Sequence, residues 1–293
     1  MLPEELLAKV KKIEWTTRKR IDQALAGQYR SRFKGHGVQF SEHRVYMPGD
    51  DVRHIDWKVT ARTRDPVLKQ YEEERHLQVL LLIDVSPSMY LGSQNRLKSE
   101  ASAELAALMA FVAIRTGDEV GAIFYSNEVK KVIPPKSGRN HVLRLIQEIL
   151  SYEEPVGGGE TQVSEALTAA MRVMKHSGIV VVISDWLSEE ADVELRRVAK
   201  KHDLVSIRIL DSLEKGFTGR GRVLFYDPES GVESEVDPES SRFRRWQSDF
   251  MSKLEEKVNR QHEKAQVGLL TIEVGEGDVD VLAAYLRHRS RGR

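Results

Sequence analysis

The chain has 293 residues, enough for one large domain or for one domain with a smaller addition. It contains no cysteine, which excludes disulfides, thiolate metal sites and cysteine nucleophiles. Its 45 basic residues balance 45 acidic ones, so no overall field attracts nucleic acid or anionic lipid. The N-terminal sequence lacks the pattern of a signal peptide, and no apolar run approaches the roughly 20 residues needed to cross a bilayer. We therefore expect a cytoplasmic protein without a membrane span.

The first quarter of the chain differs in texture from the rest. Residues 3–30 have apolar side chains at helical spacing and are predicted to form a helix. Residues 31–76 are rich in Gly, Arg, His and acidic residues, and are too polar to form a core alone. In this part we expect the rings of Tyr46 and Trp57 to be buried as anchors. The sequence thus divides into an N-terminal leader, 1–76, and a main domain, 77–293.

From residue 77 onward, apolar runs typical of buried strands alternate with helical segments. Strands are predicted at 77–84, 119–126, 178–184, 204–210 and 269–274, with 129–135 as a hairpin partner of 119–126 and a short strand pair within 222–237. Helices are predicted at 96–116, 139–151, 162–176, 189–202, 239–264 and 278–289. This alternation predicts an α/β fold, with a doubly wound, mostly parallel sheet and helices on both faces.

Small oxygen-bearing side chains follow the predicted strands at the places where a ligand would bind. In open α/β sheets the binding crevice lies beyond the carboxyl ends of the strands, where the winding reverses. One strand ends in Asp84, Ser86 and Ser88, a second ends in Asp185, and Thr161 follows a glycine-rich loop. Oxygen ligands of this kind suit a hard divalent cation, above all Mg²⁺, with Mn²⁺ or Ca²⁺ as alternatives. The simpler alternative is that these residues only cap the turns that follow the strands.

The composition of this cluster also indicates its use. Neutral hydroxyls as direct ligands leave a cation poorly neutralised, so the cation keeps a strong attraction for an incoming carboxylate. This favours docking of an acidic residue over catalysis.

The same residues resemble a known motif. The sequence DVSPSM after an apolar strand, a threonine in a later glycine-rich loop and an aspartate after a further strand resemble the metal-ion-dependent adhesion site (MIDAS) of von Willebrand factor A domains. The resemblance implies that Ser86, Ser88 and Thr161 bind the metal directly or through water. Asp84 and Asp185 would act mostly through water, and an acidic residue of a partner would complete the shell.

One position departs from this pattern. Glu160 stands between the glycines and Thr161, where the threonine would be expected to follow the glycines directly. Thr161 is therefore the least secure ligand, and Glu160 could approach the metal or a partner.

The leader carries a second resemblance. The segment GQYRSRFKGHGVQFSEHRVYMPGDDVRHIDWKVTARTRDPVLKQYEEER resembles the leader of the bacterial domain-of-unknown-function 58 (DUF58) family. That resemblance implies a partnership with a MoxR-type AAA+ ATPase in maturing or assembling other proteins. Within the segment, Arg44, Asp50, Asp51 and Arg53 are candidates for partner binding or for a salt-bridged surface.

Two functions remain open from the sequence. The first is a non-enzymatic, metal-dependent interaction module that grips a client presenting an acidic residue. The alternative is a metal-dependent hydrolase, which needs a general base near the cation. Glu160 is the one nearby candidate that the sequence offers for this base.

Overall fold

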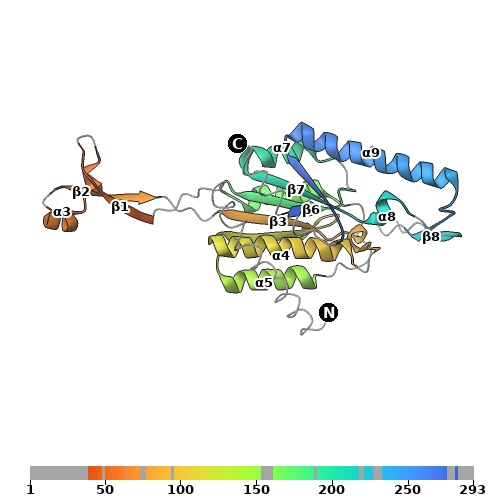
Figure 1. Ribbon diagram of the computed structural model, residues 1–293, viewed down its shortest axis with the longest axis horizontal. Helices are drawn as coiled ribbons and strands as arrows, with labels where there is room; N and C mark the ends of the chain where they lie inside the picture. Colours follow the sequence, from red (N-terminus) through yellow and green to blue (C-terminus); the bar gives the residue numbers. More distant parts are fainter. Residues whose placement is uncertain are drawn as a thin grey trace.

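The structure is a computed structural model that describes residues 39–47, 50–63, 65–72, 77–93, 96–152, 161–187, 190–217, 221–226, 233–275 and 281–282. Six strands form one sheet in the order β10-β7-β6-β3-β4-β5 (Figure 1). All neighbours pair in parallel except β4 and β5, which form the predicted antiparallel hairpin. The strands are β3 (Gln78–Asp84), β4 (Glu119–Tyr125), β5 (Val129–Lys136), β6 (Ile179–Ser184), β7 (Asp203–Leu210) and β10 (Gly268–Glu273).

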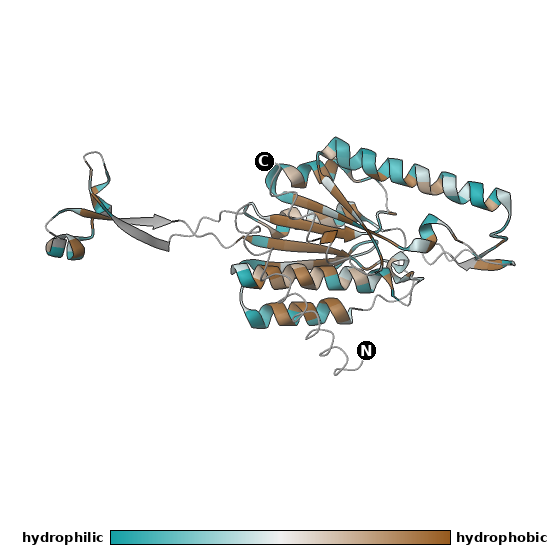
Figure 2. Cartoon of the chain, viewed as in Figure 1, coloured by the Kyte–Doolittle hydropathy of each residue, from teal (hydrophilic) through white to brown (hydrophobic). Residues whose placement is uncertain are grey.

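The central strands are buried on both faces because helices cover each side. Alternate residues of β3 enter two separate apolar clusters, with Leu81 and Ile83 in one and Leu80 and Leu82 in the other. Residues from α4 (Lys98–Thr116) and α5 (Arg139–Ser151) join the first cluster. Residues from α6 (Val163–Val173), α7 (Asp192–Lys201) and α9 (Ser241–Ala265) join the second. Figure 2 shows the strands of the sheet coloured mostly as hydrophobic, while the helices beside them mix hydrophobic and hydrophilic residues. The predicted fold class is confirmed.

The winding of the chain fixes where a ligand site can lie. From β3 the chain proceeds to β4 and β5 on one side, and later to β6, β7 and β10 on the other. The reversal falls between β3 and β6, so Asp84 and Asp185 stand at the carboxyl ends of the two strands that flank it.

The leader has regular structure that the sequence pattern did not indicate. β1 (Gln39–Val45) and β2 (Val67–Glu72) form an antiparallel pair, joined through a 3₁₀ turn (Val52–His54) and α3 (Trp57–Thr63). In Figure 1 this pair lies away from the six-stranded sheet. The expectation that Trp57 is buried is wrong, because its side chain is 69% exposed, while Tyr46 is half-buried. The predicted helix 3–30 lies outside the described residues, and the boundary at residue 76 stays a prediction.

The remaining elements lie after β7 along the chain. A short helix that was not predicted, α8 (Ser212–Lys215), follows β7, and β8 (Val223–Tyr226) pairs with β9 (Glu233–Val236) as expected. Of the predicted helix 278–289, only residues 281–282 lie in the described part. Within the described residues, no helix has the length and apolar character of a membrane span.

Candidate metal centre

The turn after β3 brings three of the predicted ligands together. Asp84, Ser86 and Ser88 are buried, with 1%, 0% and 8% of their surfaces exposed. The backbone N–H of Ser86 donates to Asp84 Oδ1 at 2.9 Å, which folds the turn back toward the strand. Pro87 then opens a 3₁₀ turn, η2 (Pro87–Tyr90), which places the Oγ atoms of Ser86 and Ser88 3.0 Å apart.

The other two predicted ligands reach the same edge of the sheet. Asp185 follows β6 and is 1% exposed, and its neighbour Ser184 donates to Asp84 Oδ2 at 2.6 Å. Thr161 is 3% exposed, and the N–H of the next residue donates to the Ser126 carbonyl at 2.7 Å. Ser126 follows Tyr125, which stands opposite Asp84 in the β3–β4 register. The structure thus places all five predicted residues at one edge, whereas Glu160 and the glycine-rich loop lie outside the described residues.

The electrostatic state of Asp84 follows from its surroundings. Its pKa is raised to about 7, chiefly because burial penalises the charged form and also because Asp185 is nearby. Hydrogen bonds from Ser184 and Ser86 favour the carboxylate but do not offset burial. A buried carboxylate of this kind gains from a divalent cation beside it.

A residue that the sequence reasoning missed lies within the centre. Lys98, the first residue of α4, is 0% exposed, and its Nζ lies 2.8 Å from Asp185 Oδ2 and 2.7 Å from Glu214 Oε1. Burial alone would lower the pKa of Lys98, but attraction by the two carboxylates outweighs burial and raises it. Lys98 is therefore a buried cation in contact with Asp185, one of the residues of the predicted metal site.

The sequence did contain a signal for Lys98. It shares a helical face with Ala101, Ser102 and Leu105, all of which are buried. A lysine on a buried stripe calls for an acidic partner. For Glu214, the signal was the capping box that it forms with Asp211 at the start of α8.

Hydrogen bonds fix the partners of Lys98 in turn. The N–H of Asp211 donates to Glu214 Oε2 at 2.8 Å, and Asp211 Oδ2 accepts from the N–H of Ser93 at 2.9 Å. On the side of β6, Arg208 Nε donates to the Asp185 carbonyl at 3.3 Å. Trp186, the residue after Asp185, has a positive φ of 59°, a left-handed conformation that is uncommon for a bulky residue. The ends of β6 and β7 are thus held in one network with the start of α4.

These donors can be compared with what a divalent cation requires. Two neighbouring ligands of an octahedral Mg²⁺, each about 2.1 Å from the ion, lie about 3.0 Å apart. The Oγ atoms of Ser86 and Ser88, which share a hydrogen bond in this structure, have the same separation. Among the described residues no three His, Asp or Glu side chains gather into a metal-binding group. What the centre offers a hard divalent cation is thus a pair of serine hydroxyls beside the carboxylate of Asp84.

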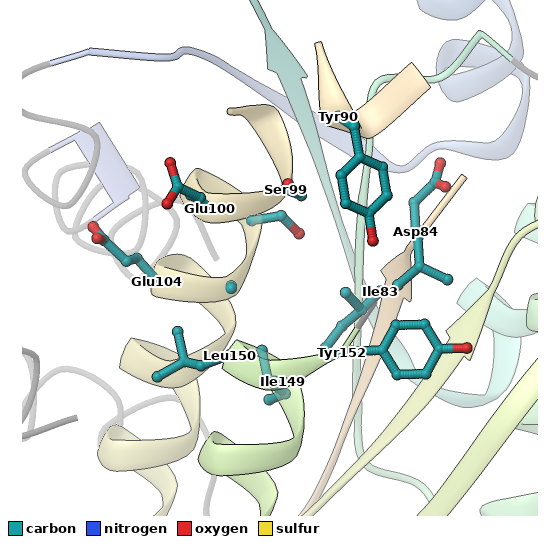
Figure 3. A pocket seen from close by; sticks show the side chains of 12 residues that line it. Ile83, Asp84, Tyr90, Ser99, Glu100, Glu104, Ile149, Leu150 and Tyr152 are labelled. Atoms are coloured by element: carbon teal, nitrogen blue, oxygen red, sulfur yellow. The ribbon is translucent and has the colours of Figure 1, made fainter. Parts of the chain in front are cut away.

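A small pocket adjoins the centre on the side of α4 and α5. It has a volume of about 70 Å³, and its lining includes Asp84, Tyr90, Glu100, Glu104 and Tyr152. Figure 3 shows the Tyr90 ring between α4 and the end of β3. Sites for small organic ligands typically measure about 300–1,000 Å³. This pocket is therefore too small to hold such a substrate.

The candidate partner-binding residues of the leader form two ion pairs. Arg44 pairs with Asp50 through two hydrogen bonds of 2.7 and 2.9 Å, and Arg53 pairs with Asp51 at 2.7 Å. Asp51 also caps the 3₁₀ turn by accepting from the N–H of Arg53. The structure thus shows a salt-bridged surface at these four residues, while their role in partner binding stays a prediction.

Sequence comparison identifies the family. The model of the family described as protein of unknown function DUF58 matches residues 42–260, which span both the leader pair and most of the sheet. The chain belongs to this family. Uncharacterized proteins of Mycobacterium tuberculosis and Mycobacterium bovis are each 31% identical over 237 residues, covering 80% of this chain and 75% of theirs. The YeaD protein of Bacillus subtilis, also uncharacterized, is 26% identical over 109 residues, covering 36% of this chain and 24% of its own.

A solved structure agrees with the fold of this DUF58 protein. The conserved hypothetical protein BatB of Bacteroides thetaiotaomicron aligns with a TM-score of 0.50 and 13% identity, over 74% of this chain and all of that one. The von Willebrand factor A domain of SpRpn10 aligns with a TM-score of 0.41 and 12% identity, over 70% and 93% of the two chains. The BatB alignment supports the α/β fold, while the von Willebrand factor A-like character stays what the sequence resemblance implies.

Proposed function

We propose that this DUF58 protein is a non-enzymatic, metal-dependent protein-interaction module. A divalent cation, Mg²⁺ or alternatively Mn²⁺ or Ca²⁺, would bind at Ser86, Ser88 and Thr161, with Asp84 and Asp185 beside them. The observation that carries the proposal is the buried pair of serine hydroxyls, 3.0 Å apart and next to a carboxylate of raised pKa.

Each residue has a distinct part in this proposal. Ser86 and Ser88 would supply two neighbouring oxygen ligands, already oriented by the turn that Asp84 holds. Ser184 keeps the Asp84 carboxylate in place by donating to Oδ2. When bound, the cation would offer an open coordination site to a carboxylate of the client protein.

Hydrolysis on the cation would need a general base, and the contacts of the described residues do not favour one. Three carboxylates of the centre are already engaged: Asp84 by Ser86 and Ser184, and Asp185 and Glu214 by Lys98. None of these three is placed as a free general base, and Glu160, the base that the sequence offers, lies outside the described residues. On the described residues we therefore prefer gripping to catalysis.

The wider role rests on the family resemblance. We extend the proposal to a cytoplasmic protein that acts with a MoxR-type AAA+ ATPase on a client presenting an acidic residue. In this arrangement the leader, with its two ion pairs, is the candidate surface for the ATPase. The metal centre is the candidate surface for the client.

The test compares Mg²⁺ and Mn²⁺ binding by wild type and by the variant Ser86→Ala/Ser88→Ala. Binding to the folded state alone raises the thermal midpoint, and the stabilisation grows with the logarithm of the ratio of free ligand to its dissociation constant. We expect millimolar cation to raise the midpoint of the wild type, chelator to reverse the rise, and the double variant to show none. Capture of a client from native lysate should be lost in the same variant and in chelator.

A matched control removes two other buried serine hydroxyls. Ser102 and Ser206 are 1% and 0% exposed, and neither Oγ has a hydrogen-bond partner among the described residues. Ser102→Ala/Ser206→Ala should therefore keep the cation response. An equal cation response in wild type and Ser86→Ala/Ser88→Ala would refute the proposal.

A further inference from the structure

The contacts of Lys98 suggest what decides how strongly the centre attracts a partner. We propose that Lys98 is a specificity-determining residue: its ammonium reserves Asp185 and Glu214, so that a divalent cation at Ser86 and Ser88 stays short of negative charge and takes a carboxylate from the partner. This inference rests on the proposed function and deepens it.

The first step is that Lys98 cannot swing away from the centre. Its side chain is fully buried, and it contacts one carboxylate from the end of β6 and one from α8. Glu214 is held by the N–H of Asp211, and Asp211 is held by Ser93 in the loop between η2 and α4. The ammonium is thus fixed between the same strand ends that carry the predicted ligands.

The second step is the balance of charge. Asp185 and Glu214 lie against Lys98, the carbonyl of Asp185 accepts from Arg208, and Asp84 and Asp211 are further buried carboxylates beside them. Lys98 neutralises one of the negative charges in this cluster. A divalent cation bound there would therefore meet one unit less of negative charge than it would without Lys98.

Removing the charge of Lys98 would change how the cluster binds both the cation and the partner. Without its charge the same divalent cation would meet one more unit of negative charge, and Asp185 would be available to the cation. The cation would then be held more tightly and would attract a partner's carboxylate less, because opposite charges attract strongly where water is excluded. Lys98 thus weakens binding of the metal and strengthens binding of the partner's carboxylate.

The decisive experiment measures these two affinities separately. Free Mn²⁺ is followed by electron paramagnetic resonance in wild type, Lys98→Met and Lys98→Arg. We expect Lys98→Met to bind Mn²⁺ at least about tenfold more tightly, because one repelling charge is lost in a buried site. Lys98→Arg should bind Mn²⁺ within about threefold of the wild type, because it keeps the positive charge. The remaining difference would come from its longer, forked side chain, which fits the two carboxylates less closely.

The second affinity uses acetate as the probe of carboxylate binding. Acetate that replaces Mn²⁺-bound water lowers the water proton relaxation rate of the Mn²⁺-loaded protein. In Lys98→Met the midpoint of this titration should move to at least about tenfold higher acetate than in wild type, because the cluster has lost one positive charge. If Lys98 only stabilised the fold, its substitution would change neither the Mn²⁺ affinity nor the acetate midpoint.

The outcomes separate the two proposals. If the wild type binds no Mn²⁺, the proposed function itself fails. If the wild type binds Mn²⁺ while Lys98→Met binds it equally or more weakly, or shows an unchanged acetate midpoint, only the role of Lys98 is overturned. Circular dichroism verifies folding, and Lys98→Gln, which is neutral but keeps a hydrogen-bond donor, replaces Lys98→Met if the latter does not fold.

Discussion

The ion pairs of the metal centre and those of the leader have nearly equal distances in opposite surroundings. Lys98 lies 2.8 Å from Asp185 with side chains 0% and 1% exposed, whereas Arg44 lies 2.7 Å from Asp50 with side chains 43% and 22% exposed. Water and salt screen the charges of the leader pair. In the buried pair, each residue depends on the other to remain charged. Distance alone therefore says little about what a charge contributes, and burial decides which pairs can control function.

The largest loss of stability is expected from a substitution that breaks the buried ion pair. Asp185→Asn leaves Lys98 with Glu214 as its remaining carboxylate contact among the described residues. Loss of one partner from a buried pair typically costs about 3 kcal/mol or more, because a charge is left insufficiently compensated. We expect this loss in the free energy of unfolding, measured by urea denaturation in chelator so that metal binding does not contribute.

The matched control removes an aspartate from an exposed pair in the same domain. Asp192 pairs with Arg196 one turn along α7, and the guanidinium is about half exposed. Asp192→Asn should cost no more than about 0.5 kcal/mol. Equal losses in the two variants would contradict the distinction between buried and exposed pairs.

The next effect concerns a buried base without a partner. His202 is 3% exposed, neither ring nitrogen has a hydrogen-bond partner among the described residues, and its pKa is lowered to about 4, chiefly by burial and then by Lys201. Since the unfolded-state pKa is about 6.5, folding favours the neutral ring. The stabilisation is complete above pH 6.5 and is lost as the pH falls toward 4, by up to about 3 kcal/mol.

This contribution is measured as a difference between two pH profiles. Asp84 has a raised pKa and acts in the opposite direction, because acidification favours its buried neutral form. Comparing His202→Phe with wild type between pH 4 and 7 removes the contribution of Asp84, which both proteins share. The variant should lose less stability on acidification, while His176→Phe, at an exposed histidine, should follow the wild-type profile. Identical profiles in wild type and His202→Phe would rule out His202 as a source of acid sensitivity.

The sequence was most informative where a residue type and its position on a strand coincide. Asp84 and Asp185 could be predicted because each directly ends an apolar run, and parallel strands bring such ends to one edge. Ser86 and Ser88 followed from the same turn. The fold class needed no side-chain detail, since alternating strands and helices restrict the topology strongly.

Lys98 and the leader show what the sequence pattern could not provide. Lys98 and Glu214 are 116 residues apart, and only the folded chain brings them together. In the leader, charged side chains along β1 concealed a strand that pairs with β2 through its backbone. The backbone pairing there is independent of the apolar pattern on which the prediction rested.

The smallest expected effect sharpens the comparison from the side of the leader. Arg44→Met removes the exposed partner of Asp50, while the N–H of Met47 still donates to Asp50 at 2.9 Å. We expect the thermal midpoint, followed by circular dichroism, to remain within experimental error of the wild type, because a screened surface pair contributes little. If these charges serve partner binding, Arg44→Met/Arg53→Met should weaken capture of the ATPase at low salt without changing that midpoint. A fall in the midpoint comparable to that of Asp185→Asn would instead show that the leader pairs support the fold.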